Sequence, residues 1–594
     1  FLVAIIGFFL IGVHGTEGLN YYTLGHPLAY GLIILTTLIL FVISRYLHDH
    51  SLFQYILALI GVSVIALALF ALSCPDMFQY LVSNANAFFG QSIHWKTIRE
   101  AKPWTFEDAW HTFQYGLILF AIGVAILLNR IRKGISPSDL FVLIWSVVVL
   151  YATMQHIRYE YYLAVPLAIL GGTALSSAIQ YVRLPRCFHT LWSADIRKTE
   201  VTRKRHDHTH QHTGLRSLFS CGGLYFCFLL LLGVLFTYNS LGVDLAFGPL
   251  HLNPDWRESM EWMDLNTPDP GVDYLKIYQE EQWQPPTESY GVMSWWDYGH
   301  MITYIAKRMP NANPFQKGVD GDYGAARFFI TTNESESSGI LDNRKTRYII
   351  TDYLMDVSIF WAMATWNNPD VGLSPYQRNF IIPNKNNPNS GQNYSFFMEP
   401  YYRTMVSRLH NFDGSLKNPD RVFYINYLKP PYSGTTDPVI VNGSELSYTE
   451  ASALIKNSTL DTDPRYGAAL VNYVYTSPVS PVPALQHYRL VHESPTRASP
   501  QELPDIRYVK IFEYVPGAVI TGDGIIEITV RTNTGREFVY RQESVNGSFT
   551  VPYPTQSRIG DVETLGLYRI VETGDEFQVT DEQIINGETV PNIF

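Results

Sequence analysis

Long apolar runs separated by short polar loops fill the chain up to about residue 237. A helix that crosses a bilayer needs ~20 apolar residues, and several of these runs are shorter, which favours tilted or partly buried helices. The pattern predicts seven membrane spans, over residues 1–13, 29–44, 52–72, 113–128, 140–153, 161–179 and 218–237. The first half is therefore expected to be a polytopic α-helical membrane domain covering residues 1–241.

Basic residues predict the orientation of these spans. Lys and Arg gather after the fourth span, at residues 130–133, and after the sixth, at residues 183–205. Cytoplasmic loops carry an excess of Lys and Arg, so both segments are expected in the cytoplasm. One further crossing then places the second half of the chain outside the cell membrane, on the same side as the long loop 75–112.

From Gly242 onward the sequence has the mixed pattern of a water-soluble fold. Helical periodicity predicts helices over 255–266, 298–309 and 357–366. Strands are predicted over 347–350, 421–427, 438–441, 468–475, 506–515, 525–532 and 536–542, with a hairpin turn at 533–535. We expect an exported α/β core over 242–420 and a β-rich region over 421–594, with the boundary between Asp420 and Pro504.

Composition narrows the class of partner. The 594 residues carry a formal net charge of -11, which argues against a nucleic-acid partner. The four Cys all precede residue 228, so the exported half must fold without disulfides. Phe1 lies inside an apolar run with no initiator Met before it, and we expect an N-terminal segment to be missing.

The residues with the most specific chemistry are Ser294-Trp295-Trp296-Asp297-Tyr298-Gly299-His300. Two indole N–H donors stand beside a carboxylate, which can only accept, in front of a segment with helical spacing. A carboxylate shielded from water by aromatic rings is suited to accept a hydrogen bond from a small alcohol such as a Ser or Thr side chain. The alternative is an aromatic core cluster with a helix-capping Asp.

Residues 295–299 spell WWDYG, which resembles the signature of the catalytic subunit of oligosaccharyltransferase, above all the archaeal single-subunit form. The resemblance implies a glycosyltransferase that moves an oligosaccharide from a dolichyl or polyprenyl (pyro)phosphate to Asn in Asn-X-Ser/Thr of exported polypeptides. Trp295, Trp296 and Asp297 would hold the Ser or Thr. The family has a GT-C type membrane domain of about thirteen helices, so this chain would hold the last seven and would be inactive alone.

Two further site assignments follow from the same resemblance. Thr97-Ile98-Arg99-Glu100 resembles the TIxE motif of an external loop in the family. Glu100 is therefore the candidate for polarising the acceptor amide and for binding Mn²⁺ or Mg²⁺, whose other ligands are expected in the missing part. Arg158 and His156 are candidates for binding the pyrophosphate of the lipid donor, since a guanidinium can hold phosphate in bidentate fashion.

A third motif of the family, DxxKxxx(M/I), has a counterpart at Asp356 to Met363, with Ile359 in place of Lys. We expect a helix near WWDYG that presents Asp356, Ile359 and Met363 on one face as part of the acceptor site. An ordinary packed helix has the same spacing.

Two other classes of function stay open. One is a membrane glycosyltransferase that uses polyprenyl-phosphate donors with another acceptor, and the other is a non-catalytic surface domain with a membrane anchor. The His-rich run 206–212 is interpreted as a solvated linker, because it would lie across the membrane from every other motif. Five sequons, at Asn333, Asn393, Asn442, Asn457 and Asn546, allow self-glycosylation but discriminate little, because such motifs arise often by chance.

Overall fold

The structure, a computed structural model, describes residues 25–73, 97–134, 136–181, 252–274, 283–384, 387–430, 432–457 and 463–591, with short pieces within 5–9, 75–83 and 228–236 and residue 276. It divides into two compact units, one of residues 69–251 and one of residues 1–68 together with 252–594. Most of the predicted first and seventh spans lies outside the described residues, as do the basic loop 183–205 and the His-rich run 206–212.

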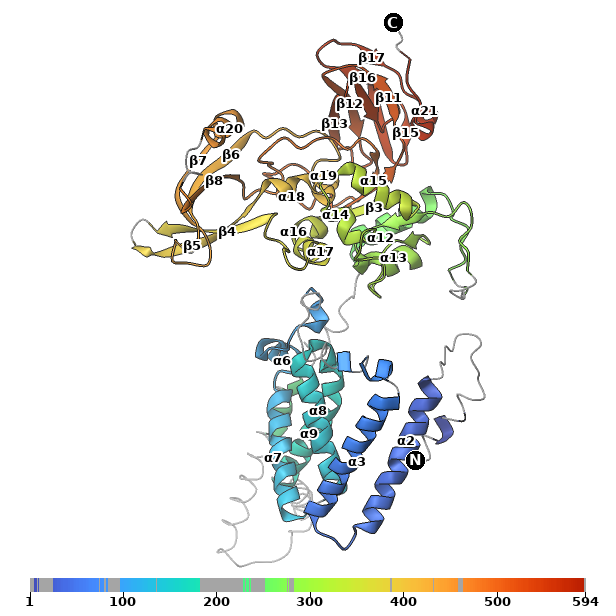
Figure 1. Ribbon diagram of the computed structural model, residues 1–594, viewed down its shortest axis with the longest axis vertical. Helices are drawn as coiled ribbons and strands as arrows, with labels where there is room; N and C mark the ends of the chain where they lie inside the picture. The colour runs from blue at the N-terminus through green and yellow to red at the C-terminus, as the bar shows by residue number, and fades with distance from the viewer. Residues whose placement is uncertain are drawn as a thin grey trace, which may run out of the picture. The chain divides into compact units, whose positions relative to one another are not determined.

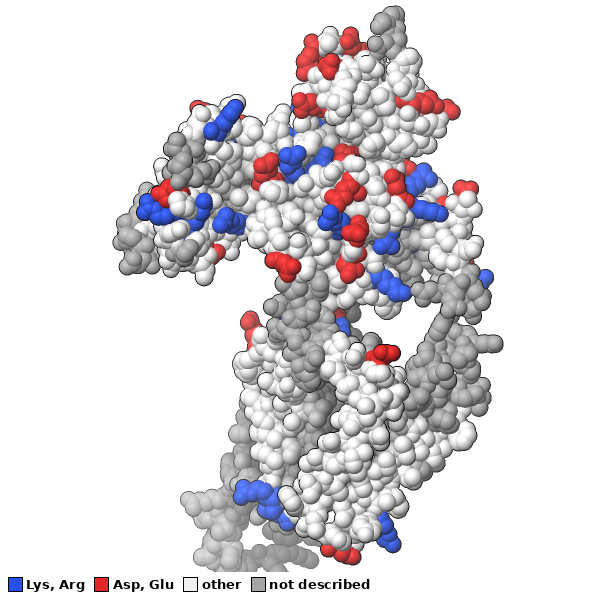
Figure 2. Space-filling view, viewed as in Figure 1, with Lys and Arg blue, Asp and Glu red and all other residues white. Residues whose placement is uncertain are grey.

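Five long apolar helices coincide with the predicted second to sixth spans: α2 (Gly25–Tyr46), α3 (Leu52–Ser73), α7 (Gly116–Lys133), α8 (Pro137–Gln155) and α9 (Glu160–Tyr181). Within the described ranges, four helices are long and apolar enough to cross a membrane. A fifth counts if α7 and α6 (Phe106–Phe113), which meet at 97°, form one broken span. Their outward side chains are apolar, with Phe41 and Phe141 both 66% exposed, and Figure 2 shows these helices almost uncharged along their length. The chain is therefore part of a multi-pass membrane protein, as predicted.

The unit of residues 69–251 is called the membrane unit below. In it, α7 and α8 both pack against α9. Helices α7 and α9 approach closely at Gly123 of α7, where an added Cβ would lie 2.2 Å from the carbonyl oxygen of Leu170. Small residues at such crossings let membrane helices gain van der Waals contact that the surrounding lipid does not supply. Gly123 therefore fixes how closely α7 and α9 can pack.

Residues 252–594 are called the globular unit below, and a five-stranded mixed sheet forms their centre. Its strand order is β2 (Met309–Pro310), β1 (Gly291–Met293), β3 (Thr346–Asp352), β10 (Val509–Tyr514), β9 (Tyr488–Glu493). Strands β2, β1 and β3 are parallel, and β10 runs antiparallel to both of its neighbours. Strand β9 lies within the interval expected to hold the boundary, between Asp420 and Pro504, and β10 lies beyond it. Nearly every residue of β3 is buried, so this strand needs a neighbour on each edge, and β10 supplies the second one.

Among the described residues, eight helices accompany this sheet (Figure 1): α12 (Pro254–Asn266), α13 (Gly299–Tyr304), α14 (Ala325–Ile330), α15 (Glu334–Asn343), α16 (Tyr353–Val357), α17 (Phe360–Asn367), α18 (Glu399–Arg403) and α19 (Met405–His410). The helix predicted over 298–309 ends early, because the chain turns through Lys307, at φ 53°, into β2. The helix predicted over 357–366 is divided, since Ser358 and Ile359 both donate to the carbonyl of Leu354, and α17 begins only after Ile359.

A second sheet has the order β5 (Asn387–Phe397), β4 (Gln377–Asn384), β7 (Val439–Ser447), β6 (Arg421–Leu428), β8 (Tyr466–Val471), and α20 (Tyr448–Lys456) packs on it. Its strands β6, β7 and β8 were predicted, whereas β4 and β5 were not. The long β4–β5 hairpin is polar and largely exposed, so it lacks the alternation of a strand with one buried face.

The C-terminal region forms two further small sheets. One pairs β11 (Ala518–Thr521) with β14 (Ser548–Val551). The other contains β13 (Glu537–Glu543), β12 (Ile525–Arg531), β16 (Val562–Ile570), β15 (Arg558–Ile559) and β17 (Glu576–Phe577), and α21 (Asp581–Asn586) follows. The hairpin turn predicted between β12 and β13 is confirmed, with the Gly535 N–H bonded to the Thr532 carbonyl and Gly535 at φ 79°.

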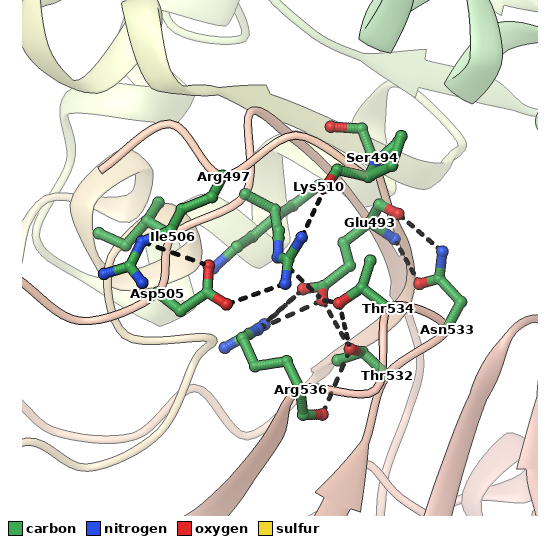
Figure 3. A network of polar contacts seen from close by, with 12 residues as sticks. Glu493, Ser494, Arg497, Asp505, Ile506, Lys510, Thr532, Asn533, Thr534 and Arg536 are labelled. Atoms are coloured by element: carbon green, nitrogen blue, oxygen red, sulfur yellow. Dashed lines mark hydrogen bonds and ion pairs between the residues drawn. The ribbon is translucent and has the colours of Figure 1, made fainter. Parts of the chain in front are cut away.

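Buried charges join this region to the core sheet. Figure 3 shows the β12–β13 turn facing Glu493, which ends β9 and accepts hydrogen bonds from the hydroxyls of Thr532 and Thr534. Arg536 pairs with both Glu493 and Asp413, and Lys510 of β10 pairs with Asp413 at 2.6 Å. The two cations lower the pKa of Asp413 against the opposing effect of burial. Since removing one member leaves an unpaired buried charge, at a typical cost of ~3–5 kcal/mol, the network holds the two parts in one register.

A steric constraint explains why residue 299, the last of WWDYG, is a glycine. An added Cβ at Gly299 would lie 2.4 Å from the carbonyl oxygen of Ala312 and 2.6 Å from the Cα of Asn313, both backbone atoms. We expect Gly299→Ala to lower the stability of the globular unit by ~1–3 kcal/mol, the usual cost of overpacking. Thermal unfolding of the protein in detergent measures the effect as a lower Tm.

Gly339→Ala is the matched control, because Gly339 lies exposed in α15 with no atom within 4 Å of the added Cβ. That change should leave the Tm equal or higher, since Ala is favoured over Gly in a helix by up to ~1 kcal/mol. An unchanged Tm in Gly299→Ala would show that the 311–313 loop yields without cost.

Candidate functional site

The WWDYG segment leaves the carboxyl end of β1 as a single 3-10 turn, Trp296–Tyr298, that runs into α13. Side chains at the carboxyl ends of neighbouring parallel strands gather at one edge of a sheet, which is where α/β proteins place ligands. Trp295 is buried, Trp296 is half-buried and Asp297 is exposed. The indole N–H of Trp296 is buried and has no acceptor among the described residues. A buried donor thus stands next to an exposed carboxylate, as hydroxyl recognition requires.

A second carboxylate, which the sequence interpretation missed, holds this turn in place. Asp352 ends β3 with no exposed surface and accepts hydrogen bonds from the Tyr298 hydroxyl at 2.5 Å and from the Trp256 indole N–H at 2.8 Å. The rings of Trp256 and Tyr298 stack with centroids 3.8 Å apart. Burial raises the pKa of Asp352, and the hydrogen bonds from its donors act in the opposite direction. Its position could have indicated this role, because Asp352 ends the parallel strand next to the strand that carries WWD.

In the third predicted motif, Asp356 to Met363, two of the three candidate site residues are buried. Asp356 and Met363 are completely buried, in two different helices, so the shared helical face expected for Asp356, Ile359 and Met363 does not exist. Asp356 instead accepts from the Tyr401 hydroxyl at 2.6 Å and the Asn411 amide at 2.9 Å. Ile359 is half-buried against the same core cluster as Trp296. Of the three, Ile359 is the one whose side chain can meet a ligand.

The predicted donor-site residues lie together in the membrane unit. The Arg158 guanidinium pairs with the Glu100 carboxylate at 3.2 Å, and both side chains are more than half exposed. His156 is different: it is buried, and its ring Nδ1 lies 2.8 Å from the carbonyl oxygen of Ala101, to which it can only donate. This contact fastens the Glu100 turn to the loop that carries Arg158, and a role of His156 in binding the lipid donor stays a prediction.

Glu160 is a further anchor of this cluster. Its carboxylate accepts from the Trp104 indole N–H and the Thr112 hydroxyl, each at 3.2 Å. The backbone adds hydrogen bonds from Ile157 N–H to the Lys102 carbonyl and from Trp104 N–H to the Met154 carbonyl. Segments 97–112 and 154–160 are thus tied together at several points. This holds Glu100 and Arg158 side by side, although more than fifty residues separate them in the chain.

The described residues do not make a metal site by themselves. Among them, no three His, Cys, Asp or Glu side chains gather closely enough to hold an ion. Glu100, the predicted ligand, has a guanidinium as its neighbour, which disfavours a second cation.

Two protein-family models match the globular unit. They are described as "AglB core domain", over residues 253–356, and "Archaeal glycosylation protein B long peripheral domain", over residues 517–590. The chain is 28% identical to dolichyl-phosphooligosaccharide-protein glycotransferase 3 of Archaeoglobus fulgidus over 90% of its own length and 63% of the relative. It is 26% identical to dolichyl-monophosphooligosaccharide-protein glycotransferase AglB of Haloferax volcanii over 74% of its length and 45% of the relative. The chain thus spans less than two thirds of either relative.

Solved structures with the same fold come from A. fulgidus. An oligosaccharyltransferase in the apo form matches with a TM-score of 0.64 and 23% identity over 99% of this chain and 71% of that one. The form tethered to an acceptor peptide containing an NVT sequon matches with a TM-score of 0.62 and 21% identity over 99% and 70%. These findings confirm the predicted resemblance and the fold class: a helical membrane part, an α/β core and a β-rich C-terminal region.

The buried Asp356 carboxyl predicts a pH dependence of stability. Burial raises its pKa from 3.8 to about 6, against hydrogen bonds from Tyr401 and Asn411 that lower it. The folded state therefore holds this proton more tightly than the unfolded chain does. The stability contributed by the group is fully present below pH 3.8 and is lost as the pH rises through about 6.

Asp356→Asn removes this titration but keeps the shape of the side chain. We expect the Tm of the wild type minus that of the variant to fall between about pH 5 and about pH 7.5, and to level off above that range. Thermal unfolding of both proteins across this range is the measurement. Parallel curves would mean that Asp356 does not change its protonation there.

Proposed function

We propose that the protein containing this chain is an oligosaccharyltransferase. It transfers an oligosaccharide from a dolichyl or polyprenyl (pyro)phosphate to the Asn of Asn-X-Ser/Thr in exported polypeptides, in the cell membrane and with its globular unit outside. The observation that carries the proposal lies at the carboxyl end of β1: the buried indole N–H of Trp296, which has no acceptor in the part of the chain that the structure describes, stands beside the exposed carboxylate of Asp297. The similarity to archaeal glycotransferases over 90% of the chain supports it.

The acceptor hydroxyl is both a donor and an acceptor, and the WWD turn offers one complementary group for each role. Asp297 accepts the hydroxyl hydrogen of the Ser or Thr, and the Trp296 N–H donates to its oxygen. Trp295, which is buried, supports the Trp296 ring, whose centroid lies 6.2 Å away. Ile359 contacts the methyl group that distinguishes Thr from Ser, and the buried Met363 backs it.

At the reacting end, the amide nitrogen of the acceptor Asn is a weak nucleophile because its lone pair is conjugated with the carbonyl, as the rotation barrier of ~18–20 kcal/mol of a peptide bond illustrates. Glu100 accepts from the amide N–H and so increases electron density on the nitrogen. This nitrogen bonds to the anomeric carbon of the sugar as the bond from that carbon to the phosphate oxygen breaks, and the nitrogen loses one N–H proton to the Glu100 carboxylate. Arg158 holds the departing pyrophosphate.

The Glu100–Arg158 ion pair is compatible with these separate roles. Exposed pairs of this kind contribute only ~0–1 kcal/mol, so substrate can separate the two charges at little cost. A Mn²⁺ or Mg²⁺ ion belongs to the proposal with Glu100 as one oxygen ligand, which suits the preference of these ions, and with its other ligands from elsewhere in the protein.

Asp297→Ala tests the acceptor site. Hydrogen bonds to charged groups contribute ~1.5–3 kcal/mol, so kcat/KM for an Asn-X-Thr peptide should fall roughly ten- to a hundredfold or more in the full-length enzyme in its membranes. Asp370→Ala, at another exposed Asp of the globular unit, is the control and should retain transfer. Wild-type activity in Asp297→Ala would remove Asp297 from the acceptor site.

Glu100→Gln tests the reacting end, because it keeps the shape and removes the charge. We expect kcat for transfer to fall by at least ~10²-fold, typical of losing a residue that moves a proton, while KM for the peptide changes less. Glu107→Gln, an exposed Glu on the same loop, should be inert. If Glu100→Gln changes only KM, Glu100 serves acceptor binding and not the transfer step.

A further inference from the structure

Two segments assigned to the acceptor site leave neighbouring parallel strands at the same edge. The WWD turn follows β1, and the segment that leads through α16 to Ile359 follows β3. Strands β1 and β3 pair directly, with Val292 opposite Tyr348 and Met293 opposite Ile349. Backbone pairing sets the strands, but beyond their ends each segment needs its own fastening, because the ladder stops there.

That fastening is a single side chain. Asp352 is the last residue of β3, and its two carboxylate oxygens face different segments. Oδ2 accepts from the Tyr298 hydroxyl and the Trp256 indole, while Oδ1 accepts from the backbone N–H of Met355 at 2.7 Å and so caps α16. The Tyr298 ring is clamped from its other direction by stacking on Trp256 of α12. Tyr298 is the residue directly after Asp297, so this bond sets where the acceptor carboxylate points.

We propose that Asp352 is a positioning residue that locks the WWD turn and the α16–α17 segment in one register, so that the hydroxyl and methyl subsites of the acceptor pocket exist together. This inference rests on the proposed function. Asp352 is fully buried and touches no substrate itself. It acts through Tyr298 on one side and through the start of α16 on the other.

Substitution by Asn is diagnostic because all three partners of Asp352 approach as donors. An amide has one acceptor oxygen and one donor NH₂ group, so whichever way the substituted side chain turns, at least one donor meets the NH₂ group. The volume stays the same, so the change removes the link without creating a cavity. A change from Tyr298 to Phe is milder, since it deletes one hydroxyl and leaves the ring stacked on Trp256.

The experiment measures binding of labelled Asn-X-Thr and Asn-X-Ala peptides, together with transfer to the former, using the full-length protein in membranes. We expect Asp352→Asn to reduce the preference for Asn-X-Thr over Asn-X-Ala about tenfold, equal to ~1.4 kcal/mol, with KM for the lipid donor unchanged. Tyr298→Phe should reduce the preference in the same direction. The double variant should be no worse than Asp352→Asn alone, because residues that act as one unit are not additive.

Glu334→Gln is the matched control. Glu334 is a half-buried carboxylate that also accepts from backbone N–H groups, those of Gln486 and His487, and among the described residues no hydrogen bond joins it to the WWD turn. It should lower the Tm and keep the peptide preference. If Asp352→Asn and Tyr298→Phe lower the Tm but keep the wild-type preference, Asp352 is only structural and the inference is overturned. If the wild type itself shows no preference for Asn-X-Thr, the proposed function fails and the inference fails with it.

Discussion

The globular unit depends on one buried carboxylate with three donors around it. Asp352 has no contact with water, so its charge is tolerable only while Trp256, Tyr298 and Met355 donate to it. This requirement fixes the start of α12, the turn after β1 and the start of α16 relative to one another. An apolar contact could not do so, because packing tolerates small slides, whereas a hydrogen bond weakens steeply as its angle departs from linear.

The two candidate clusters are built on opposite electrostatic principles. Behind the WWD turn, at Asp352, and at the join to the C-terminal region, charged groups are buried and paired, as with Glu493, Lys510 and Arg536 (Figure 3). At Glu100 and Arg158 the charges are exposed and lightly paired. Buried networks give rigid placement, and exposed pairs exchange partners easily. An acceptor subsite that recognises shape suits the first principle, and a region that binds and releases a charged group suits the second.

Several parts of the fold show where local pattern stops being informative. Strands β6, β7, β8, β12 and β13 were predicted, and in β12 and β13 buried residues alternate with more exposed ones. Strand β10 was also predicted, but its place beside β3 was not, because sheet order depends on contacts between residues more than 150 positions apart. The break at Ser358 and Ile359 escaped prediction for a related reason. Nothing in that apolar run opposes a helix, and the surrounding core divides it.

The sequence by itself determined that the first half is a set of membrane helices and that the second half is an α/β unit with a β-rich end, and it singled out residues 295–299 as the candidate for the chemistry. These are consequences of periodicity, hydrophobicity and rare residue combinations, which are local. Only the tertiary structure decided which of the candidate site residues are exposed and which are buried. It buried Trp295, Asp356, Met363 and His156, exposed Asp297, brought Glu100 beside Arg158, and revealed Asp352 as the link between two segments. Burial and partnership depend on how distant strands meet, and the order of residues along the chain does not specify that meeting without the fold.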